Sequence, residues 1–223
     1  MLLDASSSAR LAAHAPTLRL EPASLTKLMS AYVVFTAIGE KRFGLEDVVT
    51  VSATAFAAPG RDGARMFVEP AKPVTVGELL QGMLTVSGND AATALAEHTS
   101  GSVDVFVQRM NDEARRLGMV DTRFSNPTGL SDSQQYSTAA DLARLAQRLM
   151  VDFPQYANFF NRRELTYNRV TQLNRNRLLW SDPTVDGMKT GQLATVGWSI
   201  IATASRTRGT GSASYERRMI AVV

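Results

Sequence analysis

The order of its hydrophobic patterns limits what this chain can fold into. Segments typical of β-strands occur at both ends, since "MLLDAS" and "RLAAHAP" open the sequence and "GMKTGQ", "GWSIIATAS" and "RRMIAVV" close it. Between them, residues 75–151 follow helical spacing, with a capping box at Thr75 and Glu78. This order predicts an α/β (α+β) fold, in which an antiparallel sheet built from both termini is flanked by helices and carries an inserted, mostly helical lobe.

Further elements follow from local patterns. Helices are expected at about 90–98, 102–118 and 138–150. Residues 44–74 have no sustained period and suggest loops with short strands, whereas "RELTYNRVTQLN" has the composition of strands.

Length and composition indicate one globular domain, 1–223, because no Pro/Gly/Ser-rich linker divides the chain. We expect the sheet region at about 1–40 and 165–223, and the helical lobe at about 41–160. No apolar run approaches 18 residues, so no membrane-spanning helix is predicted. The start, "MLLDASSSAR", lacks the features of a signal peptide, so the sequence by itself leaves the compartment open.

Charge and rare residues exclude several classes of function. The formal net charge is only +3, and the arginines are scattered in pairs without interleaved aromatic residues, so no nucleic-acid partner is expected. The absence of cysteine excludes disulfides and thiolate chemistry. His14 and His98 alone do not build a metal site, and no G-x-S-x-G elbow supports a histidine-based serine triad. A serine enzyme of this sequence needs another base.

The stretch "EPASLTKLMSAYVVFTAIG" reveals a candidate base. It predicts an amphipathic helix that starts near Pro22 and ends at Gly39. Ser24 and Lys27 are three positions apart, so their side chains share one helix face within hydrogen-bonding reach. Ser24 would lie in the first turn, where free N–H groups and the helix dipole favour a developing negative charge. The alternative is a capping serine beside a solvated lysine.

Two further motifs lie where the predicted architecture changes. "SGN" (87–89) separates two helices of the lobe, and "KTG" (189–191) lies on a strand of the sheet. Each tripeptide occurs by chance in about one in twenty chains of this length. Taken singly, they are equally well explained as a turn and an exposed strand. Together with S-x-x-K, and with Lys27 and Lys189 as two of only four lysines, coincidence becomes a poor explanation.

These motifs resemble those of the low-molecular-mass penicillin-binding proteins, the serine-type D-alanyl-D-alanine carboxypeptidases of bacterial cell-wall metabolism. The likeness covers the whole chain, through "LLDASS", "LLQGMLTVSGNDAATALAEH", "NPTGL", "YSTAADLARL", "LNRNRLLW" and "VDGMKTG". The resemblance implies a β-lactamase/transpeptidase-like fold, peptidoglycan stem peptides as substrate and β-lactam antibiotics as inhibitors. It also implies no metal or cofactor, a periplasmic or other extracytoplasmic location, and membrane association only through a C-terminal part absent from this chain.

The resemblance implies catalytic roles for four residues. Ser24 would be the nucleophile that forms the acyl-enzyme, and Lys27, if neutral, its base. Desolvation and a second cation, Lys189, would keep Lys27 neutral. Ser87 would pass a proton toward the leaving amine, while Asn89 holds the acyl-side carbonyl and positions Lys27.

The same resemblance implies a binding strand. Lys189 and Thr190 would bind the terminal carboxylate of the substrate. Gly191, lacking a side chain, would let a peptide pair closely with the strand edge. The N–H groups of Gln192 and Ser24 would form the oxyanion hole.

One departure from the family pattern concerns substrate binding. After K-T-G the family usually has a polar pair that contains a threonine, whereas this chain has Gln192 and Leu193. The chain also stops at "MIAVV", before the closing helix and second domain of many relatives.

Two alternatives remain. A class A-like β-lactamase would need a glutamate in an E-x-x-L-N loop, and "RELTYN" does not fit that pattern. A penicillin-binding or peptidoglycan-sensing module would acylate but turn over weakly.

Overall fold

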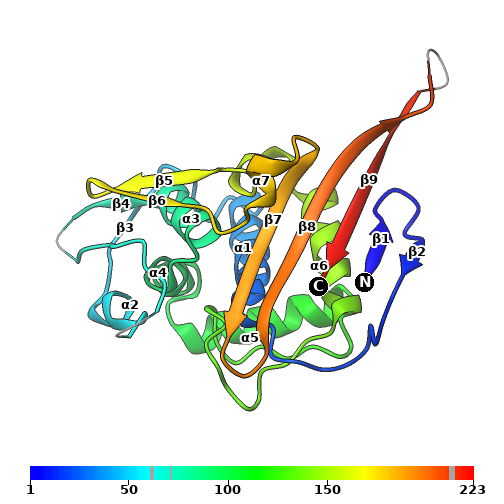
Figure 1. The fold of residues 1–223 in the computed structure, drawn as a ribbon. Helices are drawn as coiled ribbons and strands as arrows, with labels where there is room; N and C mark the ends of the chain where they lie inside the picture. Colours follow the sequence, from blue (N-terminus) through cyan, green and yellow to red (C-terminus); the bar gives the residue numbers. More distant parts are fainter. Residues whose placement is uncertain (61–62, 71, 211–213) are drawn as a thin grey trace.

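A five-stranded sheet forms one side of the molecule (Figure 1). The computed structural model describes residues 1–60, 63–70, 72–210 and 214–223. Across the sheet the strand order is β2-β1-β9-β8-β7, and every neighbouring pair is antiparallel. The strands are β1 (Leu2–Asp4), β2 (Arg10–Ala12), β7 (Val185–Leu193), β8 (Gly197–Arg208) and β9 (Tyr215–Val222). Because β1 pairs with β9, the prediction of a sheet built from both termini is confirmed.

The helices begin where the local sequence predicts. The longer helices that the structure describes are α1 (Thr26–Gly39), α3 (Val76–Thr85), α4 (Asn89–Ser100), α5 (Val103–Arg116) and α6 (Ala139–Asp152). Thr75 and Glu78 form the expected capping box, and the hydroxyls of Ser102 and Thr138 accept a backbone N–H at the starts of α5 and α6. Within the described ranges, no helix has the length and apolar character needed to cross a bilayer.

Helix α1 lies at the centre of the molecule, beside the sheet and among the other helices (Figure 1). It contacts α3, α4, α5 and α6, and its side chains are buried on nearly all sides. The prediction of an amphipathic helix is therefore wrong for α1, because a helix packed all round has no need of a polar face. This central position buries most of the polar side chains that α1 carries, Lys27 among them.

The stretch 44–74 contains one element that the sequence did not indicate. The short strands β3 (Val48–Val49) and β4 (Val74–Thr75) are present, as expected. The helix α2 (Ala53–Ala57), capped by Ser52, lies between them. Five residues are too few to show a helical period, so the pattern suggested only loops and strands.

The sheet region begins later than the expected residue 165. Strands β5 (Glu164–Tyr167) and β6 (Val170–Leu173) form a separate two-stranded hairpin, and the main sheet resumes only at Val185. The hairpin turns at Asn168 and Arg169, both with positive φ, and β5 contacts α3. Strand composition indicates that a segment is β, but it does not say which sheet the segment joins. The short helix α7 (Leu178–Ser181) connects this hairpin to the main sheet.

Aromatic packing joins α1 to the segment that follows α6. The Phe35 ring stacks on Tyr156, with centroids 4.4 Å apart, and it also contacts the rings of Phe153, Phe159 and Phe160. The side chain of Phe35 is fully buried. This cluster fixes the end of α1 opposite to Ser24.

Replacing Phe35 should therefore destabilise the whole domain. We expect Phe35→Ala to lower the free energy of unfolding by about 3–5 kcal/mol, because it removes a buried ring and leaves a cavity. Phe56→Ala, at a half-exposed phenylalanine of α2, serves as the control and should have a much smaller effect. Urea unfolding measures both values, and equal losses would contradict the assignment of Phe35 to the core.

Candidate active site

Ser24 lies at the turn that leads into α1. A single 3₁₀ turn, η1 (Ala23–Leu25), precedes the helix, so the helical start expected near Pro22 or Ala23 is confirmed with tighter geometry. The Oγ atom of Ser24 and the Nζ atom of Lys27 are 3.2 Å apart. The expected contact between these two side chains is therefore present. Ala23, immediately before Ser24, has a φ of 49°, a strained value for a residue with a side chain.

Lys27 is buried in a polar environment, and no carboxylate of the described residues is hydrogen-bonded to its amine. Its Nζ donates to Asn89 Oδ1 at 2.7 Å and to the carbonyl oxygen of Thr128. Burial holds the pKa of Lys27 well below its ordinary value, and the positive charges of Lys189 and Arg175 lower this pKa further, although the charge of Asp90 acts on the amine from a distance and opposes the lowering of its pKa. The amine is therefore biased toward its neutral form.

Lys189 is the second buried lysine of the site. It lies on β7, and its Nζ donates to the carbonyl oxygen of Thr190 at 3.0 Å. Burial, followed by the nearby charge of Arg175, lowers the pKa of Lys189 to about 7. Lys189 thus supplies the second cation expected near Lys27.

Six of the eight predicted site residues line one cleft of about 310 Å³. They are Ser24, Ser87, Asn89, Thr190, Gly191 and Gln192. The other two, Lys27 and Lys189, are buried below its surface. The structure therefore brings the three short motifs together around a single cavity.

Ser87 occupies a constrained position in this cleft. Its φ is 65°, in the left-handed region that is costly for a residue with a side chain. Its Oγ atom is buried, and no described group is hydrogen-bonded to it. Such an atom is available to a ligand in the cleft.

Gly191 is required for a reason that differs from the one expected. A Cβ atom at this position would lie 2.5 Å from Ser199 Oγ and 3.1 Å from the Cβ atom of Ala23. A side chain would therefore collide with the Ser199 hydroxyl on β8 and press on the turn that carries Ser24. The glycine lets β7 approach the turn that carries Ser24 closely, in addition to leaving the strand edge open.

A loop at residues 126–130 completes the cleft, and the sequence did not identify it as part of the site. Asn126 Oδ1 accepts the backbone N–H groups of Thr128 and Gly129, which shapes the turn that points the Thr128 carbonyl at Lys27. Gly129 has a φ of 82°, and a Cβ atom there would lie 1.9 Å from the Ala23 carbonyl oxygen. The residue types in "NPTGL" are typical of a turn, but they do not indicate that the Thr128 carbonyl oxygen accepts a hydrogen bond from Lys27.

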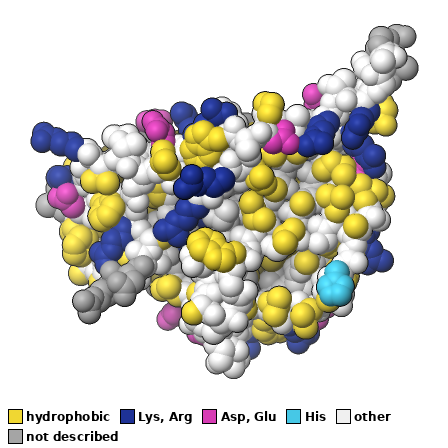
Figure 2. Space-filling view, in the orientation of Figure 1, with side chains coloured by type: hydrophobic (Ala, Val, Ile, Leu, Met, Phe, Trp, Pro, Cys, Tyr) yellow, Lys and Arg dark blue, Asp and Glu magenta, His cyan; other side chains and the backbone are white. Residues whose placement is uncertain are grey.

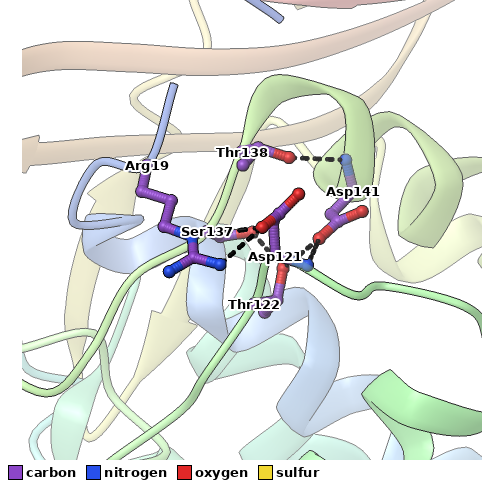
Figure 3. Close-up of polar contacts among 6 residues, drawn as sticks. All are labelled: Arg19, Asp121, Thr122, Ser137, Thr138 and Asp141. Atoms are coloured by element: carbon purple, nitrogen blue, oxygen red, sulfur yellow. Dashed lines mark hydrogen bonds and ion pairs between the residues drawn. The ribbon is translucent and has the colours of Figure 1, made fainter. Parts of the chain in front are cut away.

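A polar cluster closes the base of this loop (Figure 3). The Asp141 carboxylate accepts the backbone N–H of Asp121 at 2.9 Å and the hydroxyl of Thr122 at 2.7 Å. Thr122 and Ser137 share a hydrogen bond of 2.8 Å between their hydroxyls. The chain segments that enter and leave the loop, at Thr122 and Ser137, are therefore fixed to each other and to the start of α6.

Arg175 is another residue of the cleft that the sequence patterns did not indicate. It follows the β5–β6 hairpin and lies between the buried residues Asn174 and Asn176. Asn176 donates to the Gly187 carbonyl oxygen at 3.2 Å, which holds this segment against β7. Figure 2 shows basic side chains gathered between this hairpin and β7. The only sequence signal for Arg175 is the string "NRN" at 174–176. In the structure both asparagines are buried and the arginine between them is exposed.

Comparison with known proteins identifies the family. The sequence profile of the D-alanyl-D-alanine carboxypeptidase family matches residues 1–223. The chain belongs to this family. The D-alanyl-D-alanine carboxypeptidase DacA of Haemophilus influenzae is 39% identical over 224 residues, which cover 100% of this chain and 55% of that protein. The chain thus spans about half the length of the curated relatives it matches.

Solved structures of relatives share the fold. Penicillin binding protein 5 from Haemophilus influenzae has a TM-score of 0.90 at 38% identity, over 98% of this chain and 62% of that one. Penicillin-Binding Protein D2 from Listeria monocytogenes, in its cefotaxime-bound form, has a TM-score of 0.84 at 25% identity, over 99% of this chain and 87% of that one. These likenesses confirm the transpeptidase-like fold that the motifs implied.

The protonation of the two buried lysines can be measured directly. In an NMR titration of ¹³C-labelled lysine side chains, Lys189 should titrate near pH 7. Lys27 should titrate far below the ordinary lysine value of about 10.4, because burial disfavours its charge. Lys27→Arg and Lys189→Arg assign the two signals. Titration of both groups near 10.4 would contradict this description of the site.

Proposed function

We propose that this protein is a serine-type D-Ala-D-Ala carboxypeptidase that removes the terminal D-Ala from peptidoglycan stem pentapeptides. The observation that carries the proposal is the arrangement around Lys27 Nζ, where Asn89 Oδ1 and the Thr128 carbonyl both accept hydrogen bonds and Ser24 Oγ lies 3.2 Å away. A neutral amine has two N–H donors and one lone pair. With both donors used, the lone pair remains for the proton of the Ser24 hydroxyl.

In the acylation step, Ser24 Oγ bonds to the carbonyl carbon of the penultimate D-Ala, and its proton moves to Lys27 Nζ. The N–H groups of Ser24 and Gln192 stabilise the oxyanion that forms. For Ser24 this role is supported by its place at a helix start, where N–H groups have no intrahelical acceptor.

The C–N bond then breaks and D-Ala leaves. Its nitrogen takes a proton from the Ser87 hydroxyl, which Lys27 then reprotonates. No described group is hydrogen-bonded to the buried Ser87 Oγ, so this hydroxyl is available to the leaving nitrogen. Water next attacks the ester carbon, gives one proton back through Lys27 to Ser24 Oγ, and releases the shortened peptide as its carboxylic acid. No metal or cofactor enters these steps.

Substrate binding in this proposal depends on the carboxylate of the terminal D-Ala. Thr190 and the exposed Arg175 line the cleft, and the buried Lys189, whose Nζ donates to the Thr190 carbonyl oxygen, lies beneath its surface, so donors and positive charge are available to this carboxylate. Leu193 lines the same cleft, close after K-T-G, where the family pattern implies a threonine. Gly191 keeps the edge of β7 open to the peptide backbone.

The cleft supports a carboxypeptidase better than a class A-like β-lactamase. Its lining, within the described part of the chain, includes no aspartate or glutamate that would activate the deacylating water. Because peptidoglycan lies outside the cytoplasmic membrane, we propose an extracytoplasmic location. Structures of the Listeria relative with cefotaxime and ampicillin bound support β-lactams as ligands of this cleft.

A β-lactam should add covalently to Ser24. Intact mass spectrometry after incubation with benzylpenicillin should show one adduct, which peptide mapping places on Ser24, whereas Ser24→Ala should remain unmodified. Release of D-Ala from a pentapeptide then separates an enzyme from a module that acylates but turns over weakly. An unchanged mass, or an adduct on another serine, would refute the proposal.

Leu193 provides a test of carboxylate binding. We expect Leu193→Thr to increase kcat/KM for D-Ala-D-Ala peptides by about tenfold, because one charge-assisted hydrogen bond contributes about 1.5–3 kcal/mol. An ester substrate without the terminal carboxylate should gain much less. Leu193→Val, with the shape of threonine but no hydroxyl, is the matched control. Equal gains on both substrates would show that position 193 does not face the carboxylate.

A further inference from the structure

The carboxylate of Asp90, the residue after S-G-N, is buried at the start of α4. Its oxygens accept backbone N–H groups from one short segment: Met66 at 2.8 and 3.1 Å, Phe67 at 2.9 Å and Val68 at 3.2 Å. The N–H of Ala91 donates to the same carboxylate at 2.9 Å. Both carboxylate oxygens are therefore fully occupied by backbone donors.

The segment held by Asp90 forms one wall of the cleft. Gly63 and Ala64, just before it, line the cavity. The Ala64 carbonyl oxygen accepts the backbone N–H of Asn89 at 2.9 Å. We call residues 63–68 the cleft wall. This wall is thus joined to the S-G-N turn twice, through Asn89 and through Asp90.

The outer side of the cleft wall is held by the β5–β6 hairpin. Gln172 Nε2 donates to the Arg65 carbonyl oxygen at 3.0 Å, and Asn168 Nδ2 donates to the Phe67 carbonyl oxygen at 2.8 Å. Three backbone N–H groups of the wall therefore donate to the Asp90 carboxylate, and two of its carbonyl groups accept hydrogen bonds from side-chain amides of the hairpin. Such a segment has little freedom to shift.

This support is needed because the S-G-N turn is strained. Ser87 has left-handed backbone geometry, which persists only where the surroundings enforce it. The space around the turn is tight, since a Cβ atom at Gly88 would lie 2.8 Å from Asp90 Oδ1 and 2.9 Å from the Met66 nitrogen. Asp90 is thus in the immediate packing layer behind Ser87.

We propose that Asp90 is a positioning residue that locks the cleft wall to the S-G-N turn and thereby holds Ser87 in its reactive orientation. The proposal deepens the carboxypeptidase function and rests on it for the role of Ser87. Asparagine cannot replace this carboxylate, because its NH2 group would face backbone N–H donors that need an acceptor.

Asp90→Asn tests the proposal, with acylation by a fluorescent penicillin as the readout at a temperature where all variants are folded. We expect acylation to slow by about 10- to 100-fold, as for loss of a group that orients a catalytic residue. Asp4→Asn is the control, since Asp4 is also buried and accepts the N–H groups of Ser6 and Ser7, as well as that of Arg217 Nε, but on β1, which β9 and β8 separate from β7. Its acylation rate should stay within about threefold of the wild-type rate.

A double-mutant cycle separates positioning from general damage. If Asp90 acts through Ser87, then adding Asp90→Asn to Ser87→Ala should slow acylation by no more than about threefold beyond Ser87→Ala alone. Additive losses would overturn the proposal. An unaltered acylation rate in Asp90→Asn would overturn it as well.

Hydrogen exchange provides a readout that is independent of activity. The amides of Met66, Phe67 and Val68 should exchange faster in Asp90→Asn than in the wild type, and unchanged protection would contradict the proposed lock. Failure of the wild-type protein to acylate would instead refute the proposed function, while exchange still tests the lock.

A milder variant covers the case in which Asp90→Asn does not fold. Gln172→Ala removes only the outer support of the wall and should slow acylation by about 3- to 10-fold, again without additivity to Ser87→Ala. Gln147→Ala is its control, because Gln147 also donates to a backbone carbonyl, that of Ala5, far from the cleft. Equal effects of the two glutamine variants would overturn the proposal.

Discussion

The burial of the Lys27 amine is the constraint on which the rest of the site depends. An ammonium ion taken out of water without a carboxylate partner costs several kcal/mol, so this lysine is more stable as a neutral amine with its hydrogen bonds satisfied. Asn89 and the Thr128 carbonyl satisfy them, and they come from segments far apart in the chain. The central position of α1 makes this possible, because it exposes the start of the helix to the lobe, the loop and the sheet at once.

Bringing these segments together leaves strain that the packing must hold. Ala23, which precedes Ser24, and Ser87 both have positive φ values. A side chain at Gly129 would collide with the Ser24 turn, and one at Gly191 would collide with Ser199 and press on that turn. The supports that the structure describes are buried polar groups. The Asp141 carboxylate accepts a backbone N–H at the base of the loop that carries Thr128. The Asp90 carboxylate likewise accepts backbone N–H groups, from the cleft wall.

Features that depend on residues close together in the sequence could be predicted from it. Contacts made by backbone atoms could not. The caps of α3, α5 and α6 and the Ser24–Lys27 contact follow from spacing within one or two turns. The Thr128 carbonyl was missed because a main-chain ligand has no side-chain signature. Arg175 was missed because its relevance depends on distance from Lys189, which tertiary packing sets. The composition of the β5–β6 segment correctly predicted strands. It did not show that they form a separate sheet, because the pairing of strands depends on residues far apart in the sequence.

The central claim is that Ser24 is activated by a neutral Lys27 beside a second lysine that binds the substrate carboxylate. The pH dependence of the acylation rate with a carboxylate-bearing penicillin tests it most directly. We expect a bell-shaped profile, with an acid limb from protonation of Lys27 and an alkaline limb, beginning near pH 7, from loss of the Lys189 charge. A rate that rises steadily to about pH 10.4, the ordinary value for lysine, would contradict the account.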